Sequence, residues 1–194
     1  PWTCCFAGLE LRVAQLEMVL THPDYRGRGL VRLQMENFEQ AVKERGYDLS
    51  IIWGIPYYYR QFGYAYAIDG DARESLPAWK IPAVTIGSTH TLNLRPAEIT
   101  DMSRLVKLYE ETTSPLDFHV RRAPAHWRYL LEAARHPVQI VENAQTGEAL
   151  GYVTLQRNPD SVTILECGLS RAEVALSLLQ MLKSEGAPQV LITW

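Results

Sequence analysis

The sequence predicts a mixed α/β (α+β) fold in which mixed β-sheets are flanked by helices. In the first half, an amphipathic helix expected at 30–45 separates a strand from the nearly continuous apolar run 49–53. Because that run is apolar on both faces, we expect a buried strand that runs parallel to the strand before the helix. In the second half, the expected order is one strand, two helices, three strands, one helix and one strand. The fold class rests on these two orders of elements.

The elements of the first half are predicted from hydrophobic spacing and from glycine positions. Residues 5–13 alternate loosely and residues 16–21 alternate clearly, so two strands joined by a hairpin at 14–15 are expected. Apolar residues then recur at spacings of four, three and four, which indicates the helix at 30–45. Gly46 is expected to end that helix, directly after basic residues in its last turn.

A short helix at 56–62 is predicted next, because Pro56 suits a first helical position and Gly63 suits the position after a helix. A strand is expected at 64–68. The stretch 69–91 is interpreted as a linker with short strand pieces at 81–86.

The second half begins with a strand at 92–97 and a helix that Thr100 or Asp101 caps. Another helix is expected to start at Pro124. Ser170 and Glu173 form a capping box for a later helix. The remaining elements are strands at 138–142, 149–156 and 161–167, a helix at 171–185 and a closing strand at 190–194.

Composition narrows the function and the location. The net charge is −3 and the isoelectric point is about 6.0, which argues against a nucleic-acid or membrane-surface role. Cys4, Cys5 and Cys167 are odd in number and lack metal-ligand spacing, so a reducing cytoplasm is expected. No run of 18 apolar residues and no signal-peptide pattern occurs. The chain opens on Pro1-Trp2-Thr3 without an initiator Met, so a fragment or the ordered part of a longer protein is expected.

The stretch 19–30 has the features of an anion-binding turn. A strand end is followed by the turn His22-Pro23-Asp24, and Gly27 and Gly29 then lead into the helix at 30. The first N–H groups of a helix lack intrahelical partners and carry partial positive charge, to which Arg26 and Arg28 add full charges. A phosphate or pyrophosphate is therefore expected here, although the Walker and Rossmann patterns are both absent.

The run Arg26-Gly27-Arg28-Gly29-Leu30 resembles the acetyl-CoA loop of the GNAT acetyltransferases, whose pattern is Gln/Arg-x-x-Gly-x-Gly/Ala. The resemblance implies that this loop binds the pyrophosphate of acetyl-CoA and that the preceding strand pairs with its pantetheine arm. Val31 departs from the pattern, but tandem GNAT proteins of the "enhanced intracellular survival" (Eis-like) type are similar to it in having an aliphatic residue there. The implied cofactor-binding residues are Val19, Leu20, Thr21, Arg26, Gly27, Arg28, Gly29, Leu30 and Val31.

A second resemblance lies about thirty residues downstream. Tyr59-Arg60-Gln61-Phe62-Gly63-Tyr64 is similar to the GNAT ending Tyr-x-x-aliphatic-Gly-aromatic. The resemblance implies that Tyr59 lies near the acetyl-CoA sulfur and acts as general acid. The alternative is that Tyr59 is a core aromatic.

Glu17 is the local candidate for a general base because its side chain is expected on the same strand face as Val19 and Thr21. The alternative is that Glu17 is a solvated strand residue.

The chain is interpreted as the back portion of one GNAT domain, 1–88, followed by a second, degenerate GNAT-like domain, 89–194. At the corresponding turn the second copy reads Cys167-Gly168-Leu169-Ser170-Arg171-Ala172, with one Gly. Ser170 is expected to bond the N–H groups that a pyrophosphate would need. The second domain is therefore predicted to lack cofactor binding.

A polar cluster in the stretch 113–126 is a candidate metal site, but the spacing of its histidines matches no usual ligand set, so a surface loop and no metal are expected. Its members are Asp117, His119, Arg121, Arg122 and His126.

Three functions remain open. The first is an acetyl-CoA-dependent N-acetyltransferase that acts on a primary amine of a small molecule or on lysine. The second is a non-catalytic GNAT-like module that binds CoA or a partner protein. The third, a nucleic-acid binder, is disfavoured by the net charge. The expected partners are thus an amine acceptor, with no nucleic acid and no membrane, and homo-oligomerisation stays open.

Overall fold

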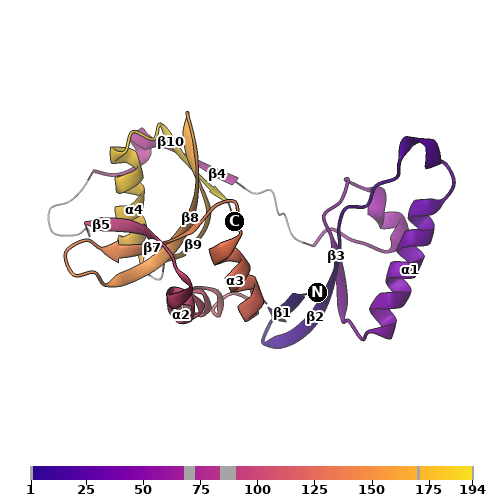
Figure 1. Ribbon diagram of the computed structural model, residues 1–194. Helices are drawn as coiled ribbons and strands as arrows, with labels where there is room; N and C mark the ends of the chain where they lie inside the picture. Colours follow the sequence, from indigo (N-terminus) through magenta and orange to yellow (C-terminus); the bar gives the residue numbers. More distant parts are fainter. Residues whose placement is uncertain (1, 68–72, 84–90, 170, 194) are drawn as a thin grey trace. The chain divides into compact units, whose positions relative to one another are not determined.

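The computed structural model describes residues 2–67, 73–83, 91–169 and 171–193, which form two compact units (Figure 1). Unit 1 comprises Pro1–Ile68 and Asp117–Arg121, and unit 2 comprises Asp69–Leu116 and Arg122–Trp194. Each unit contains one mixed sheet with helices beside it, so the predicted fold class is confirmed.

The bounds of the elements are as follows. The helices are α1 (Leu30–Glu44), α2 (Met102–Thr113), α3 (Pro124–Glu132) and α4 (Ala172–Ser184). The short 3-10 helices are η1 (Pro23–Tyr25), η2 (Tyr58–Phe62), η3 (Ala78–Lys80) and η4 (Ile99–Asp101). The strands are β1 (Trp2–Phe6), β2 (Leu9–Leu16), β3 (Leu49–Ile52), β4 (Arg73–Pro77), β5 (Leu92–Pro96), β6 (Phe118–Arg121), β7 (Val138–Asn143), β8 (Ala149–Asn158), β9 (Ser161–Leu169) and β10 (Gln189–Thr193).

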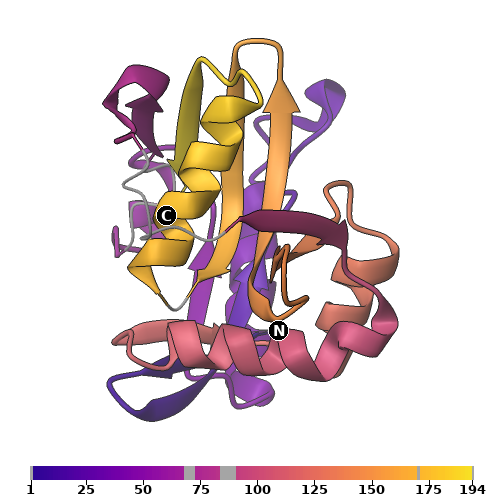
Figure 2. The same ribbon diagram turned by 90° about the vertical axis from the view of Figure 1, so that its left-hand side faces the viewer.

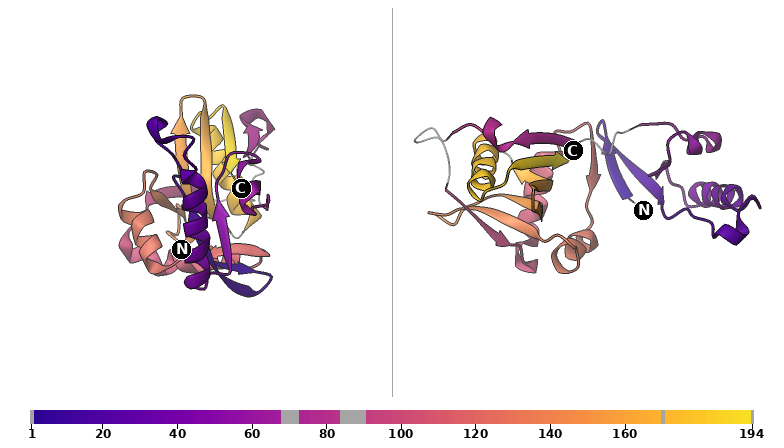
Figure 3. Two further views of the ribbon diagram at one scale, coloured as in Figure 1. Left: turned by 90° about the vertical axis from the view of Figure 1, so that its right-hand side faces the viewer. Right: turned by 90° about the horizontal axis from the view of Figure 1, so that it is seen from above.

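The sheet of unit 1 has the strand order β3-β2-β1-β6. β2 runs parallel to β3, as predicted from the apolar run 49–53, and β1 is antiparallel to both β2 and β6. Figure 3 shows α1 alongside this sheet. The predicted hairpin at 14–15 is wrong. The turn between β1 and β2 is formed by Ala7 and Gly8, whose φ angles are 47° and 81°.

Two predicted strands of unit 1 are absent. β2 ends at Leu16, and Met18 has a φ of 58°, which interrupts the extended backbone expected over 16–21. Residues 64–67 form no strand either, and residue 68 lies outside the described part. The short helix expected at 56–62 is present as η2, with Gly63 after it at a φ of 84°.

The sheet of unit 2 has the order β4-β10-β9-β8-β7-β5, in which β9 and β10 are parallel and the other neighbours are antiparallel. Figures 1 and 2 show α4 on one face of this sheet. The core beneath α4 includes Val153, Val174 and Leu178, whereas Trp127 and Tyr152 belong to a second core that packs with α2 and α3. Both faces of the sheet are therefore covered within the unit.

The region 69–91 differs from the linker that the sequence predicts. β4 lies in it and pairs with β10, so this strand belongs to unit 2 in the structure although it precedes the domain boundary predicted at residue 88. Residues 81–83 form no strand, and residues 84–86 lie outside the described part.

The start of α2 is fixed by a capping box in which Glu98 and Asp101 bond one another's backbone N–H groups. Asp101 also accepts two hydrogen bonds from the Arg95 guanidinium, at 2.6 and 2.8 Å. This pairing, together with the backbone bond, lowers the pKa of Asp101 to about 2. Asp101, one of the two predicted caps, is the N-cap residue of α2, but its side chain accepts from the N–H of Glu98 and not from one in the first turn of α2. The capping role predicted for Ser170 lies outside the described residues.

The expected surface loop at 113–126 is wrong, because most of this stretch is regular structure. α2 continues to Thr113, β6 spans Phe118–Arg121 and α3 starts at Pro124. β6 pairs with β1, at the Cys4–Val120 position among others. This strand was missed because its pairing partner lies more than a hundred residues earlier in the chain.

Candidate functional site

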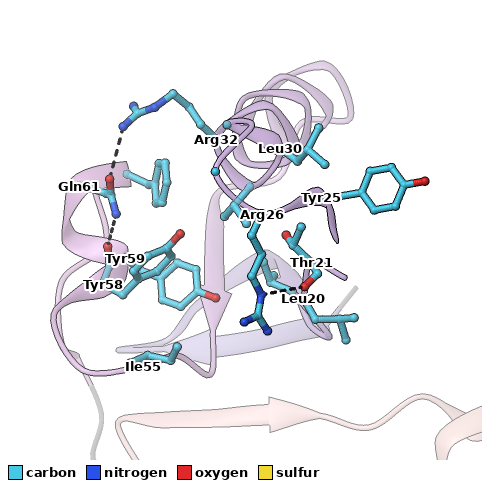
Figure 4. Close-up of a pocket in the computed structure, with 15 residues that line it drawn as sticks. Leu20, Thr21, Tyr25, Arg26, Leu30, Arg32, Ile55, Tyr58, Tyr59 and Gln61 are labelled. Atoms are coloured by element: carbon cyan, nitrogen blue, oxygen red, sulfur yellow. Dashed lines mark hydrogen bonds between the residues drawn. The ribbon is translucent and has the colours of Figure 1, made fainter. Parts of the chain in front are cut away.

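A pocket of about 590 Å³ opens in unit 1 between the N-terminus of α1 and the short helix η2 (Figure 4). Most of the residues that sequence motifs assign to cofactor binding line it, and so does Tyr59. Those residues are Val19, Leu20, Thr21, Arg26, Gly27, Gly29, Leu30 and Val31. Arg28 and Glu17 are not among the lining residues. The two motifs, about thirty residues apart in sequence, thus meet at one cavity.

The N-terminus of α1 is open toward a ligand. Its N-cap is Gly29, which has a φ of 72° and no side chain to bond the first N–H groups. The first intrahelical bond is that from Leu33 N to Gly29 O, at 3.1 Å, which leaves the N–H groups before Leu33 without helical acceptors. The first turn contains no acidic residue, and a Cβ built on Gly27 or Gly29 would meet no atom within 4 Å. The space in front of the loop is therefore free.

The arginines of the loop differ in their surroundings. Arg26 donates from Nε to the carbonyl of Thr21 at 3.4 Å, which holds its guanidinium at the pocket wall (Figure 4). Arg28 instead donates to the carbonyl of Asp24 at 3.0 Å and stacks over the ring of Tyr25, with 5.0 Å between the guanidinium carbon and the ring centroid. In this geometry Arg26 faces the pocket and Arg28 braces the loop.

The segment 19–21 lies where the parallel strands separate. The last register pair of β2 and β3 is Leu16 with Ile52, and after it the positive φ of Met18 turns the chain away. Within the described part of the chain, the N–H groups of residues 19–21 have no hydrogen-bond partner. They are available to a ligand that enters between the strand ends.

Tyr59 is 9% exposed and packs in an aromatic group on η2. Its ring centroid lies 5.0 Å from that of Tyr58, 6.4 Å from that of Phe62 and 6.2 Å from that of Tyr64. Gly54 makes room for the ring, because a Cβ on Gly54 would lie 2.3 Å from Tyr59 Cδ2. Burial, with smaller contributions from Tyr58 and Tyr64, raises the pKa of the Tyr59 hydroxyl. The group therefore stays protonated at neutral pH and has a proton to donate.

Glu17 is exposed and lies outside the pocket lining. Gln15 Nε2 donates to its carboxylate, and Gln15 Oε1 accepts from the indole N–H of Trp2. The strand alternation that placed Glu17 on the same face as Val19 fails at Met18, because the backbone there is left-handed. Its role as a base stays a prediction.

Several lining residues were not predicted from the motifs. An apolar and aromatic wall is contributed by Ile55, Tyr58 and Phe62, and a further cation, Arg32, extends from the first turn of α1. Gln61 and Tyr25 complete the set. None of the described residues that line the pocket is acidic. Arg32 lies just past the loop pattern, so only its place in the first turn of the predicted helix could have indicated that it lines the pocket.

The polar cluster at 117–126 is separated into different ion pairs. Arg121 pairs with Glu10 at 2.7 Å, whereas Arg122 pairs with Glu166 at 2.6 Å. In the described ranges, no three His, Cys, Asp or Glu side chains are grouped so that they could hold a metal ion. Nor is any helix of those ranges long and apolar enough to cross a membrane. All three cysteines are free.

The site combines a loop with open N–H groups, a nearby arginine and a protonated tyrosine, which is the arrangement expected of an acyl-CoA-dependent transferase. The family comparison agrees: residues 1–67 match the family model of the acetyltransferase (GNAT) domain. This match confirms the resemblance that the two motifs carry, over the stretch that contains both of them. Comparison with curated proteins gave no match.

Solved structures share the fold over nearly the whole chain. They include a conserved protein from Enterococcus faecalis V583 described as a probable N-acyltransferase (TM-score 0.78, 18% identity) and a GCN5-related N-acetyltransferase from Kribbella flavida (TM-score 0.75, 18% identity). Eis1 from Mycobacterium abscessus is also similar, with a TM-score of 0.66 and 17% identity. The matches cover 99%, 100% and 98% of this chain but only 50%, 48% and 50% of those proteins. The chain thus spans about half their length.

Proposed function

We propose that the protein is an N-acetyltransferase that transfers the acetyl group of acetyl-CoA to a primary amine of a small molecule or of lysine. The observation that carries the proposal is the pocket in which the Gly27–Gly29 loop and Tyr59 face each other (Figure 4). The GNAT family match over residues 1–67 supports the acyltransferase class.

The residues present fit the phosphates of CoA. The Arg26 guanidinium is held at the pocket wall, and the uncapped N-terminus of α1 offers N–H donors. No acidic side chain in the first turn of α1 opposes a phosphate. Val31, a branched residue where the GNAT pattern has Gly or Ala, lines the same pocket.

When bound, the cofactor supplies an activated acetyl thioester. The N–H groups of residues 19–21 are free to hold the pantetheine arm and to polarise the thioester carbonyl. The amine nitrogen bonds to that carbonyl carbon, the carbon–sulfur bond breaks, and Tyr59 gives its proton to the departing sulfur. The proton that the amine loses goes to a base, for which Glu17 is the candidate in the sequence and solvent water is the other acceptor.

Two measurements test the proposal. Isothermal titration with acetyl-CoA, and separately with a DNA duplex, is expected to show binding of acetyl-CoA only. A free-thiol release assay over a panel of primary amines is then expected to show turnover with at least one of them. Because Cys167 is an exposed free thiol, the signal of the protein alone is measured without acetyl-CoA and subtracted.

The same pair of measurements separates the alternative function. Binding of acetyl-CoA without turnover of any amine would favour the non-catalytic, CoA-binding module over the enzyme. Absence of acetyl-CoA binding would overturn both.

A further inference from the structure

Arg32 lies in the first turn of α1 and reaches across the pocket toward the helix that carries Tyr59. Its Nη2 donates to Gln61 Oε1 at 3.4 Å, and its guanidinium carbon lies 5.5 Å from the ring centroid of Phe62 (Figure 4). Gln61 and Phe62 both belong to η2. Among the hydrogen bonds and ring contacts of the described residues, those of Arg32 are the ones that link α1 to η2.

The link continues into the backbone of η2. Gln61 Nε2 donates to the carbonyl of Tyr58 at 3.1 Å, so the amide of Gln61 is oriented with its oxygen toward Arg32. Tyr58 is the residue before Tyr59, and the two rings are in edge contact. A guanidinium on one helix is thus connected, through one amide, to the peptide that precedes the predicted proton donor.

The chain that follows η2 is attached to the sheet. The hydroxyl of Tyr64, which follows η2, lies 3.0 Å from Ser50 Oγ on β3. The ring of Tyr59 rests on Gly54, just after β3. These contacts hold η2 to the sheet, whereas the contacts of Arg32 hold it to α1.

We propose that Arg32 is a positioning residue, which holds η2 against the N-terminus of α1 and thereby sets the Tyr59 hydroxyl at the pocket. This inference rests on the proposed acetyl transfer. Lysine is a poor substitute, because the planar fork of Arg can bond Gln61 while its face lies over Phe62.

The size of the effect follows from the kind of contact. A solvent-exposed hydrogen bond and one ring contact are each worth on the order of 1 kcal/mol or less, so their loss corresponds to about a three- to tenfold change in rate. We expect Arg32→Met to lower kcat by about that factor and to leave the KM for acetyl-CoA within about twofold. Gln61→Leu removes the same link from the other side and should give the same result, and the double variant should lose no more than either single variant.

The test adds Lys43→Met as a matched control, because Lys43 is an exposed cation near the far end of the same helix and pairs only with Glu39 in the described contacts. Each variant is also made in a Tyr59→Phe background. If Arg32 acts through Tyr59, Arg32→Met has no further effect on kcat there. If the losses in kcat from Arg32→Met and Tyr59→Phe multiply in the double variant, the positioning role is overturned. It is also overturned if Arg32→Met raises the KM for acetyl-CoA while kcat is unchanged, because Arg32 would then be a direct ligand of a cofactor phosphate.

A second readout does not depend on turnover. The protein is labelled with 3-fluorotyrosine, and the Tyr59 fluorine resonance is assigned by its absence in Tyr59→Phe. Arg32→Met is expected to shift this resonance, whereas Lys43→Met leaves it in place. An unmoved resonance overturns the inference even in an active enzyme. A parent protein without turnover counts against the acetyltransferase proposal alone, since the resonance still reports on Arg32.

Discussion

Replacing Tyr59 with Phe removes one oxygen atom and leaves the rest of the site intact. The ring keeps its contacts with Tyr58, Phe62 and Tyr64, and it still fits over Gly54. Within the described part of the chain, the hydroxyl has no hydrogen-bond partner, and no buried polar side-chain atom there lacks one. The hydroxyl therefore reaches the pocket rather than the core, and its loss leaves no other group unsatisfied. We expect the free energy of unfolding to change by less than about 0.5 kcal/mol.

The effect on catalysis should be much larger. General-acid help contributes roughly 10²–10⁴ in rate, which corresponds to about 3–5 kcal/mol of transition-state stabilisation. Turnover in the thiol-release assay should fall by that factor, while the acetyl-CoA affinity from isothermal titration should hardly change. The raised pKa of Tyr59 gives the sign of the pH effect. The donor is protonated below that pKa, so its contribution to turnover is lost as the pH rises through it, and this alkaline loss should vanish in the variant.

A matched control distinguishes the hydroxyl from the aromatic cluster. Tyr57 precedes η2, is 70% exposed and does not line the pocket, so Tyr57→Phe should keep the parental rate. If Tyr59→Phe also turns over at the parental rate, Tyr59 is a packing residue and the proposed proton donor is wrong.

Three further predictions concern the loop, the glycine under Tyr59 and the start of α2. Gly29→Glu should abolish acetyl-CoA binding in titration, because it places a carboxylate where a phosphate is expected. Gly29→Asn, in which Asn tolerates the φ of 72°, should retain binding, and equal affinities of the two variants would refute the loop assignment. Gly54→Ala should lower turnover more than acetyl-CoA affinity, because the added Cβ overlaps the Tyr59 ring, and unchanged turnover would show that the ring need not stay there. The pKa of Asp101 is lowered from 3.8 to about 2, so its ionised form contributes about 2 kcal/mol of stability above pH 4, which is lost as the pH falls through 2. In Asp101→Asn this pH-dependent part of the free energy of unfolding should be missing. Curves of stability against pH that run parallel for the parent and the variant would contradict this.

Local sequence signals predicted the elements that depend on local spacing. α1, β3 and η2 were found where periodicity, an apolar run and the Pro56–Gly63 pair indicated them. The strands and helices of unit 2 with strong patterns, such as β8 and α4, were found in the same way. The residues of the two motifs could also be named, because their spacing alone carries the resemblance.

The sequence predictions that were wrong or missing share a cause. The local structure there is determined by contacts distant in sequence, or by a backbone conformation that the residue type does not reveal. Met18 alternates like a strand residue, yet its φ is 58° because the chain turns there toward the loop. β6 is short and gains its strand conformation from pairing with β1. β4 likewise exists through β10. Arg32 was overlooked for the related reason that its partners, Gln61 and Phe62, lie on another helix.

The helices of the two parallel crossovers differ in the charge at their N-termini. In both β2-α1-β3 and β9-α4-β10, a helix connects two parallel strands. α1 begins at Gly29 and carries no acid in its first turn, whereas α4 has Arg171 at its N-cap and Glu173 in its first turn. No side chain caps an N–H group of α4, but a carboxylate in its first turn is attracted by the helix dipole and repels a second anion. The open terminus of α1 lacks such a group, and a phosphate can take that place.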